Sequence, residues 1–431
     1  MPRFPQTFRV RQALDRTRVE DIPAEVEAQL GRLNLSRRVA PGHRVAITAG
    51  SRGIANIATV LKATVDHLTA LGARPFIVPA MGSHGGGTAE GQQRLIESYG
   101  VTEAFCGCPV RSSLDTVVVC EAAEGFPVHF DRHAFEADHV IVCNRVKPHT
   151  MFVGEVESGL LKMMLVGLGK REGATVYHRA IQDYSFPRIV ESVAREVLQR
   201  CAIAGGLALV ENGYEETAHV EAVAPDDLLE REKALLLLAR RLLPGLPFRF
   251  VDVLVVDEMG KNISGTGIDT NVVGRRFNDH KATDDEFPKV KRIAVRSLTE
   301  GSHGNALGIG VADFCTSRLM AGADMEATRI NGITSLHLSA ARMPFVYDTD
   351  AEMLDVALST IGLATPENTR LLWIRNTLVL EEVECSVAYL EEARNRDDLE
   401  VVTDPRDLPF DAQGDLPPSM ATTTGLPTRA R

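Results

Sequence analysis

Two hydrophobic patterns alternate along the chain. Short runs rich in valine, isoleucine and leucine are separated by longer stretches whose apolar residues recur every three or four positions. The first pattern predicts strands and the second predicts amphipathic helices. Strands are expected at 44–50, 74–82, 115–122, 127–133, 138–146, 206–212, 251–260, 291–298, 371–378 and 399–404, and helices at 57–72, 89–100, 186–201, 226–243 and 353–362. This alternation favours an α/β fold with mostly parallel sheets.

The alternation is interrupted at PGLPF (residues 244–248), after which a second α/β series begins with VDVLVVDEMG. We therefore expect two α/β domains, an N-terminal catalytic domain of residues 1–245 and a C-terminal domain of residues 246–403. An active-site cleft is expected between them. Residues 404–431 are rich in proline and threonine, which predicts a flexible tail.

The charge balance argues against two classes of partner. The 431-residue chain has 47 Lys and Arg against 58 Asp and Glu, a formal net charge of −11. Nucleic acids and anionic membranes are bound by clustered basic residues, so neither is expected. No apolar run approaches the roughly 18 residues of a membrane span, and the N-terminus lacks the apolar core of a secretory signal. Seven scattered cysteines form no CxxC pair, which favours a cytoplasmic location.

Four polar residues follow predicted strands. Arg52 comes after RVAITAGS, and His84 comes after PFIVPAMGS. His149 comes after VIVCNRVKP, and Lys261 comes after VLVVDEMG. Ligands bind at the carboxyl ends of strands in open α/β sheets. Each residue alone also fits a surface loop, so their shared position is the informative observation. The glycines beside His84 would let a ligand approach the backbone closely.

One lysine stands inside an apolar stretch. SGLLKMMLVGLGK (residues 158–170) places Lys162 among leucine and methionine residues. A lysine in such a run most often lies on an amphipathic helix with its ammonium group in water. Alternatively, apolar surroundings favour the neutral amine by desolvation, and a neutral amine can form a covalent bond. His178, in TVYHRA, fits a helix surface on its own.

A group of three histidines is a weaker candidate for a metal site. His129, His133 and His139 lie close in sequence, but only the first two have helical i, i+4 spacing. Their surroundings predict strand and turn rather than a continuous helix, which argues against a metal site.

Two glycine-containing segments remain ambiguous. GTGIDTNVVGR (residues 265–275) matches neither a Walker A motif nor GxGxxG. A site for a phosphate or substrate anion and a plain loop are both compatible with it. The tetrapeptide GSHG occurs at residues 82–85 and again at 301–304, each time after a predicted strand.

Taken together, these residues resemble the nickel-dependent lactate racemase family. The resemblance rests on GSHGGGT with His84, KPHT with His149, SGLLK with Lys162 and YHR with His178, in this order. The spacing is similar to that of the family: His149 lies 65 residues after His84, and His178 lies 16 residues after Lys162. The resemblance extends over roughly residues 10–395.

The resemblance implies a nickel-pincer nucleotide, a pyridinium mononucleotide whose two sulfur-bearing arms and one carbon grip a nickel ion. Lys162 would be attached covalently to this cofactor, His178 would be the nickel ligand, and Ser51 would contact the cofactor. Soft donors in a square plane suit Ni(II). Proteins that synthesise the cofactor would be partners for its loading.

The resemblance also implies an isomerase, a racemase or epimerase of a 2-hydroxy acid that works by proton-coupled hydride transfer. His84 and His149 would be the two bases, one for each enantiomer, since histidine titrates near neutral pH. Arg52 would bind the substrate carboxylate through a two-point fork. Lys261 would face the carboxylate or carbonyl oxygen from the second domain.

Departures from the family pattern imply a divergent member with a substrate other than lactate. Gly159-Leu160-Leu161-Lys162 stands in place of Gly-Gly-Arg-Lys. Ala49 stands where an acidic residue is expected, and Glu258 replaces an amide. A larger or differently charged hydroxy acid, such as a sugar acid, fits these changes. The sequence selects no single substrate and leaves the oligomeric state open.

Two alternatives remain at this point. The first is an oxidoreductase or lyase that uses a free nucleotide or metal on the same scaffold, although the missing GxGxxG argues against an ordinary dinucleotide dehydrogenase. The second is a non-catalytic protein that binds a hydroxy acid or a nucleotide. Two histidines after strands argue mildly against the second, because a binding protein needs no pair of bases.

Overall fold

The chain divides into two compact units. The structure, a computed structural model, describes residues 3–51, 53–181, 183–276 and 286–418. One unit is Asp15–Leu243, and the other combines Met1–Leu14 with Pro244–Arg431. The first fourteen residues therefore belong to the second of these units and not, as expected, to a domain of residues 1–245. The reason is that β1 (Thr7–Gln12) pairs antiparallel with β14 (Glu382–Ser386) and β15 (Leu399–Val401).

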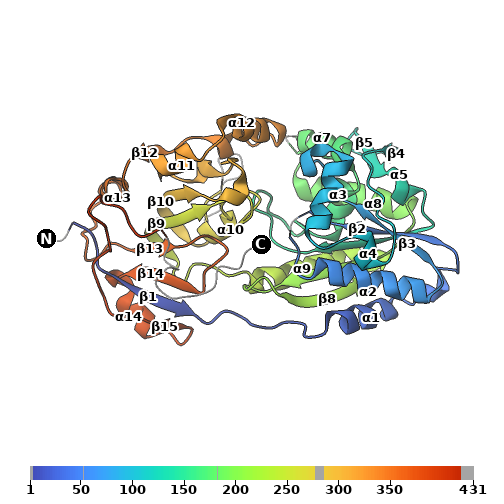
Figure 1. Ribbon diagram of the computed structural model, residues 1–431, viewed down its shortest axis with the longest axis horizontal. Helices are drawn as coiled ribbons and strands as arrows, with labels where there is room; N and C mark the ends of the chain where they lie inside the picture. The colour runs from blue at the N-terminus through green and yellow to red at the C-terminus, as the bar shows by residue number, and fades with distance from the viewer. Residues whose placement is uncertain (1–2, 52, 182, 277–285, 419–431) are drawn as a thin grey trace. The chain divides into compact units, whose positions relative to one another are not determined.

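The unit Asp15–Leu243 contains a five-stranded sheet of order β3-β2-β6-β7-β8 (Figure 1). All neighbouring strands run parallel except β8, which is antiparallel to β7. The bounds are β2 (Arg44–Ala49), β3 (Arg74–Pro79), β6 (His139–Arg145), β7 (Ile203–Glu211) and β8 (Thr217–Val223). β4 (Thr116–Glu121) and β5 (Pro127–Asp131) form a separate antiparallel pair. The α/β fold with mostly parallel pairing is confirmed in this unit.

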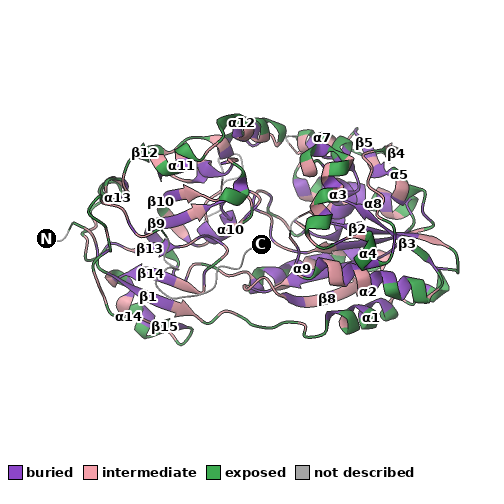
Figure 2. Ribbon diagram, viewed as in Figure 1, coloured by how far each residue is buried: buried purple, intermediate pink, exposed green. Residues whose placement is uncertain are grey.

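Helices cover both faces of this sheet. Successive strand residues point to opposite faces, so Ile77 and Ile141 pack with α1 and α2, whereas Phe76 and Val142 pack with α8 and α9. The buried strands are visible in Figure 2. The bounds are α1 (Ile22–Arg32), η1 (Leu35–Arg37), α2 (Ile57–Ala70), η2 (Gly85–Gly87), α3 (Ala89–Ser98), α4 (Glu103–Cys106), α5 (Arg132–Phe135), α6 (Leu160–Lys162), the π-helix η3 (Met163–Gly167), α7 (Lys170–Ala180), α8 (Phe186–Arg200), η4 (Pro225–Asp227) and α9 (Leu228–Leu242).

The other unit contains an eight-stranded sheet of order β12-β11-β10-β9-β13-β14-β1-β15. From β12 to β13 the strands are parallel, and from β13 to β15 they are antiparallel. The strands not yet bounded are β9 (Phe250–Met259), β10 (Lys289–Leu298), β11 (Phe314–Thr316), β12 (Phe345–Tyr347) and β13 (Leu371–Ile374). The helices are α10 (Thr270–Val273), η5 (Glu300–Ser302), η6 (Ile309–Val311), α11 (Ser317–Ala321), α12 (Met325–Thr334), η7 (Leu338–Ala341), α13 (Asp350–Ser359), η8 (Val387–Tyr389) and α14 (Leu390–Arg394). None of the helices within the described ranges is both long and apolar enough to cross a membrane.

The segment after residue 404 packs against this second sheet as far as it is described. Leu408 and Leu416 are 8% and 4% exposed and join the cluster of Val253, Phe314 and Trp373. Residues 404–418 therefore do not form the expected flexible tail, because their two leucines are buried. The rest of that expected tail, residues 419–431, lies outside the described residues.

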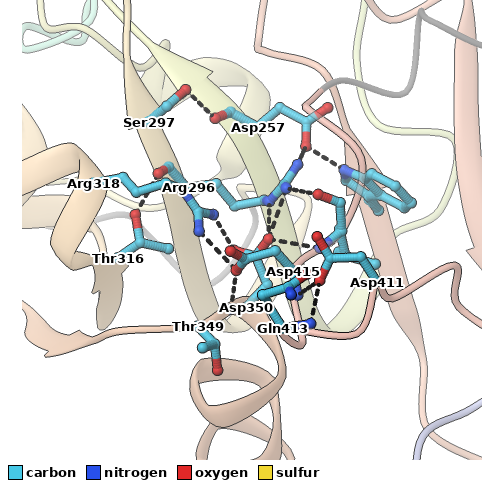
Figure 3. Close-up of polar contacts among 12 residues, drawn as sticks. Asp257, Arg296, Ser297, Thr316, Arg318, Thr349, Asp350, Asp411, Gln413 and Asp415 are labelled. Carbon is cyan, nitrogen blue, oxygen red and sulfur yellow. Dashed lines mark hydrogen bonds and ion pairs between the residues drawn. The ribbon is translucent and has the colours of Figure 1, made fainter.

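A buried arginine links two strands of this sheet to the C-terminal segment (Figure 3). Arg296, on β10, pairs with Asp257 of β9 and with Asp350, which begins α13. Its guanidinium also donates to the carbonyl of Leu416 at 2.8 Å. The indole of Trp373 donates to the same carboxylate of Asp257. Two carboxylates and a carbonyl thus compensate a charge whose side chain is 4% exposed, as a buried ion requires.

Candidate active site

Three predicted site residues follow neighbouring strands of the five-stranded sheet. β2 lies between β3 and β6 and is parallel to both, so their carboxyl ends share one edge. Ser51 follows β2, His84 follows β3 and His149 follows β6. The chain passes from β2 to β3 on one side and later returns to β6 on the other side. This reversal is the topological switch point at which open α/β sheets bind ligands. Arg52 lies outside the described residues.

Ser51 and His84 are in direct contact. The hydroxyl of Ser51 is hydrogen-bonded to Nδ1 of His84. The backbone carbonyl of Ser51 accepts a hydrogen bond from the hydroxyl of Tyr99 at 2.8 Å. His84 is half-buried. The contact fixes the imidazole ring, and Nε2 is the ring nitrogen that faces away from Ser51.

The loop around His84 depends on glycine. Gly82 and all of residues 85–87 have positive φ angles, between +59° and +69°, a region that favours glycine. A Cβ on Gly85 would lie 2.6 Å from the backbone nitrogen of Gln92. Gln92 is fully buried, and its amide donates to the carbonyls of Gly82 at 2.8 Å and His84 at 3.3 Å. Sequence reasoning missed this residue; its signal is a polar side chain on the buried face of α3.

Lys162 is the last residue of α6, directly before the π-helix η3. Its neighbours Leu160, Leu161, Met163 and Met164 are buried, whereas Lys162 itself is half-buried. π-Helical turns are rare and are frequently found at functional sites. The stretch is therefore not one regular amphipathic helix, because its apolar residues enter the core and Lys162 stands at its margin.

The final lysine of the same stretch has a structural position. Lys170 is fully buried, and its ammonium group lies 2.8 Å from the carboxylate of Asp131, which is also fully buried. It also donates to the carbonyl of Pro79. Lys170 therefore connects the start of α7, which carries His178, to the end of β3, which leads to His84.

The segment of Lys162 and His178 packs against two of the strand ends. A Cβ on Gly82 would lie 3.1 Å from Val166 and 3.5 Å from Ala174. Ala174 and His178 are four residues apart on α7 and share a helix face. The loop of His84 therefore contacts α7 one turn before His178, which is half-buried.

The end of β2 contacts the same segment. A Cβ on Gly50 would lie 3.3 Å from the methyl group of Met163, next to Lys162. The amide of Asn144, near the end of β6, donates to the carbonyl of Gly159 at 2.9 Å. The structure thus brings the segments of Ser51, His84, Lys162 and His178 together within one unit.

His149 lies in a loop stacked on aromatic rings. Its ring is 4.5 Å from that of Phe152 at an interplanar angle of 17°. Its Nδ1 accepts hydrogen bonds from the backbone N–H groups of Met151 at 3.1 Å and Phe152 at 3.3 Å. The backbone N–H of His149 donates to the buried carboxylate of Glu157. Because Nδ1 accepts, the neutral ring carries its proton on Nε2.

Lys261 lies in the other unit, after β9. Its ammonium group donates to the carbonyls of Gly265 at 2.9 Å and Leu307 at 3.3 Å. Its backbone N–H donates to the hydroxyl of Ser302 at 3.0 Å. Lys261 is half-buried. These contacts fix its side chain between its own loop and the segment of Leu307.

A second polar group after a strand was missed in the sequence. Arg375 and Asn376 follow β13 and donate to the same carboxylate oxygen of Glu258, at 3.1 and 2.8 Å. β9 pairs with β13 on one side and β10 on the other, so these residues also lie at a switch point. The rule that selected Lys261, a polar residue after a strand, would have found Arg375 and Asn376 as well.

The two glycine-containing segments have separate structures. In the loop 265–275, Arg275 pairs with Asp313 at 2.6 Å and donates to several backbone carbonyls. Arg275 therefore has a structural role. The two GSHG segments are not conformational copies. His84 has φ −66°, whereas His303 has φ +46° and is exposed.

The described residues contain no group of three or more His, Cys, Asp or Glu side chains arranged to hold a metal ion. His129 and His139 do not form such a group, and burial lowers the pKa of both. The cofactor that the resemblance implies would require one amine and one imidazole from the protein. Lys162 at the end of α6 and His178 on α7, both half-buried, are candidates for these two groups.

Comparison with known proteins gives one family match. Residues 9–186 match the family described as lactate racemase N-terminal domain. Among solved structures, the lactate racemase apoprotein from Thermoanaerobacterium thermosaccharolyticum is similar at 10% sequence identity, with a TM-score of 0.45 over 79% of this chain and 97% of that chain. No curated protein matches the sequence significantly. Residues 9–186 of this chain are therefore similar to a lactate racemase N-terminal domain.

Proposed function

We propose that the protein is a racemase or epimerase of a 2-hydroxy acid and that it uses a nickel-pincer nucleotide. The main support is the packing of Gly50 and Gly82, which lie beside the hydrogen-bonded Ser51 and His84, against the segment of Lys162 and His178. This packing lies within a match to the lactate racemase N-terminal domain that covers all of these residues. Departures from the lactate pattern at Ala49, Leu160 and Leu161 favour a larger or differently charged hydroxy acid, such as a sugar acid.

Two residues would hold the cofactor. Lys162 would form the covalent link, because its apolar neighbours favour the neutral, nucleophilic amine. His178 would be the protein ligand of the nickel ion, and Ser51 would contact the cofactor. When bound, the cofactor supplies a reversible acceptor for hydride from the substrate's α-carbon.

The remaining residues would handle the proton and the carboxylate. His84, oriented by Ser51, would take the hydroxyl proton at Nε2 and return it. Arg52 would bind the substrate carboxylate, and Lys261 would face an oxygen of the substrate. His149 has Nε2–H in its neutral form, because two N–H groups point at Nδ1. For His149 to act as a base at Nε2, the hydrogen bonds from the backbone N–H groups of Met151 and Phe152 to Nδ1 must break.

The attachment of the cofactor can be tested by mass spectrometry. Co-expression with the cofactor's biosynthetic proteins should give a covalent adduct and bound nickel in the wild-type chain. Lys162→Ala should lose the adduct, and His178→Ala should lose nickel while keeping the adduct. Lys62→Ala, on the exposed side of α2, is the matched control and should behave as wild type. An adduct that persists in Lys162→Ala contradicts the assignment.

The reaction can be tested with the loaded protein and a panel of 2-hydroxy acids, including sugar acids, followed by chiral chromatography. Interconversion of stereoisomers at C2 without net formation of keto acid supports the proposal. We expect His84→Ala to lower the rate at least 100-fold, since general acid–base catalysis contributes about 10²–10⁴-fold. Net formation of a keto acid or an alkene would favour the oxidoreductase or lyase alternative. Binding without turnover would favour a non-catalytic protein.

A further inference from the structure

A buried carboxyl group contacts the residues that directly precede Lys162. Glu232, on α9, is 1% exposed. It lies on the same helix face as Leu228, Leu235 and Leu236, at positions i, i+4, i+7 and i+8, and these leucines belong to the core cluster. That spacing marks the apolar face of a helix. A glutamate on this face requires a specific reason, since burial of an ionisable group is costly.

The carboxyl group of Glu232 contacts the turn that leads into Lys162. Its Oε2 accepts a hydrogen bond from the backbone N–H of Leu161 at 2.9 Å, and the N–H of Leu160 stabilises it as well. A Cβ on Gly159 would lie 2.5 Å from the carboxyl carbon. The approach therefore requires glycine at position 159, and the glycine in SGLLK is explained by Glu232.

The contact leaves one oxygen unsatisfied. Oε1 of Glu232 is buried and makes no hydrogen bond within the part of the chain that the structure describes. Burial raises the pKa of Glu232 to about 7, and the backbone N–H groups of Leu160 and Leu161 oppose that rise. A leucine at this position would avoid both penalties. Buried polar groups with an unsatisfied atom are rare in native proteins and call for an explanation.

We propose that Glu232 is a positioning residue for Lys162. Its carboxyl group holds the N–H groups of the turn from which Lys162 projects, and so fixes the place of the amine at the margin of the core. The role of Lys162 itself rests on the proposed function. The effect of Glu232 on the turn does not, so it can be measured on the chain without cofactor or substrate.

The first measurement is amide hydrogen exchange at Leu161 together with acylation of lysines, both followed by peptide mass spectrometry. In Glu232→Ala we expect the Leu161 amide to exchange roughly 10-fold faster or more, because a hydrogen bond to a carboxylate is lost. We expect Lys162 to be acylated at least threefold faster relative to Lys62, which serves as the internal reference. Glu232→Gln keeps a carbonyl acceptor and should restore both rates to within about twofold of wild type.

A double-mutant cycle and a control separate this role from general destabilisation. Gly159→Ala should also speed acylation of Lys162, because the added methyl group displaces the carboxyl group. The effects of Gly159→Ala and Glu232→Ala should not be additive, since each breaks the same contact. Val193→Ala weakens the same core cluster from α8 and should leave the relative acylation of Lys162 unchanged. Wild-type rates in Glu232→Ala, additive effects in the cycle, or failure of Glu232→Gln to restore the rates would each overturn the proposal. These outcomes are distinguishable from failure of the racemase assay, which requires the loaded protein.

Discussion

At the residue scale, the two lysines of SGLLKMMLVGLGK have opposite environments. Lys170 is fully buried and pairs with Asp131, whereas Lys162 stays half-buried between apolar neighbours. A carboxylate partner compensates the charge of a buried ammonium group. Apolar surroundings disfavour the charged form of an amine. Within residues 158–170, Lys170 thus has a structural position, whereas the proposed covalent role belongs to Lys162.

The raised pKa of Glu232 predicts a pH-dependent stability. Between its ordinary value of 4.5 and about 7, the folded chain keeps a proton on Glu232 that the unfolded chain has released. Unfolding then releases protons, so this group's contribution is complete below pH 4.5 and is lost as pH rises through 7. Glutamine cannot ionise, so the unfolding free energy of Glu232→Gln relative to wild type should increase by roughly 2–3 kcal/mol from pH 4.5 to pH 8. Calorimetry across this range measures the difference.

The matched control for that measurement is Glu230→Gln, also on α9 but with an exposed side chain. Its stability difference from wild type should not change in the same direction between pH 4.5 and pH 8. A difference between Glu232→Gln and wild type that stays constant over this range would contradict the assigned ionisation of Glu232.

Sequence patterns indicated which residues follow strands but not which buried residues support them. His84, His149 and Lys261 follow strands as expected, whereas Arg52 lies outside the described residues, and the roles of all four remain predictions. Gln92 and Glu232 were missed because a polar residue on an apolar helix face has no meaning until its partner is known. The partners are backbone groups of other segments, Gly82 before α3 and Leu161 in α6, and such contacts leave no local pattern in the sequence.

At the element scale, Lys170 holds the start of α7 to β5 through a buried ion pair and to β3 through a hydrogen bond. Lys170 bonds the last residue of β3, Pro79, and pairs with Asp131 at the end of β5. Lys170→Met should leave the carboxylate of Asp131 buried without its partner, which typically costs about 3–5 kcal/mol. We expect a matching fall in the calorimetric stability of the unit Asp15–Leu243, and faster hydrogen exchange in the loop of His84.

Lys62→Met is the control for this prediction. Lys62 pairs with Asp66 on the surface of α2, where both side chains are exposed. Removing such a pair should produce no measurable change, because exposed ion pairs contribute little. Equal effects of Lys170→Met and Lys62→Met would mean that burial of the Lys170 pair has no consequence for the fold.

The expected strands and helices are present because their hydrophobic periods are strong. The strand expected at 44–50 is β2, and the helix expected at 186–201 is α8. β1 and β14 were not anticipated, since charged residues interrupt them. Their arginines and glutamates pair across the strands: Arg9 contacts Glu384 at 3.2 Å, and Arg11 contacts Glu382 at 2.8 Å. Two buried apolar residues alternate with these charges in each strand, Phe8 and Val10 in β1 and Val383 and Cys385 in β14, but so short an alternation between charged residues was not recognised as a strand.

At the scale of the whole molecule, both ends of the described chain are built into the same unit. β1 supplies a strand to the eight-stranded sheet, and Thr7 forms a bridge with Arg406. Composition suggested instead that residue 404 begins a tail. Composition averages over a segment, whereas burial depends on single residues such as Leu408 and Leu416. The proline and threonine that dominated the composition lie mainly beyond residue 416.

This arrangement predicts unequal effects of two truncations. A chain ending at Thr403 loses the buried Leu408 and Leu416, each worth about 1.5–3 kcal/mol. It also loses the carbonyl that satisfies Arg296 and the pairing of Arg406 with Glu384 at 2.8 Å. The calorimetric transition of the second unit should therefore weaken by at least about 3 kcal/mol or disappear. A chain ending at Pro418 keeps all of these contacts and should unfold as wild type does. If the chain ending at Thr403 also retains wild-type stability, then the buried arginine of Figure 3 does not depend on the C-terminal segment.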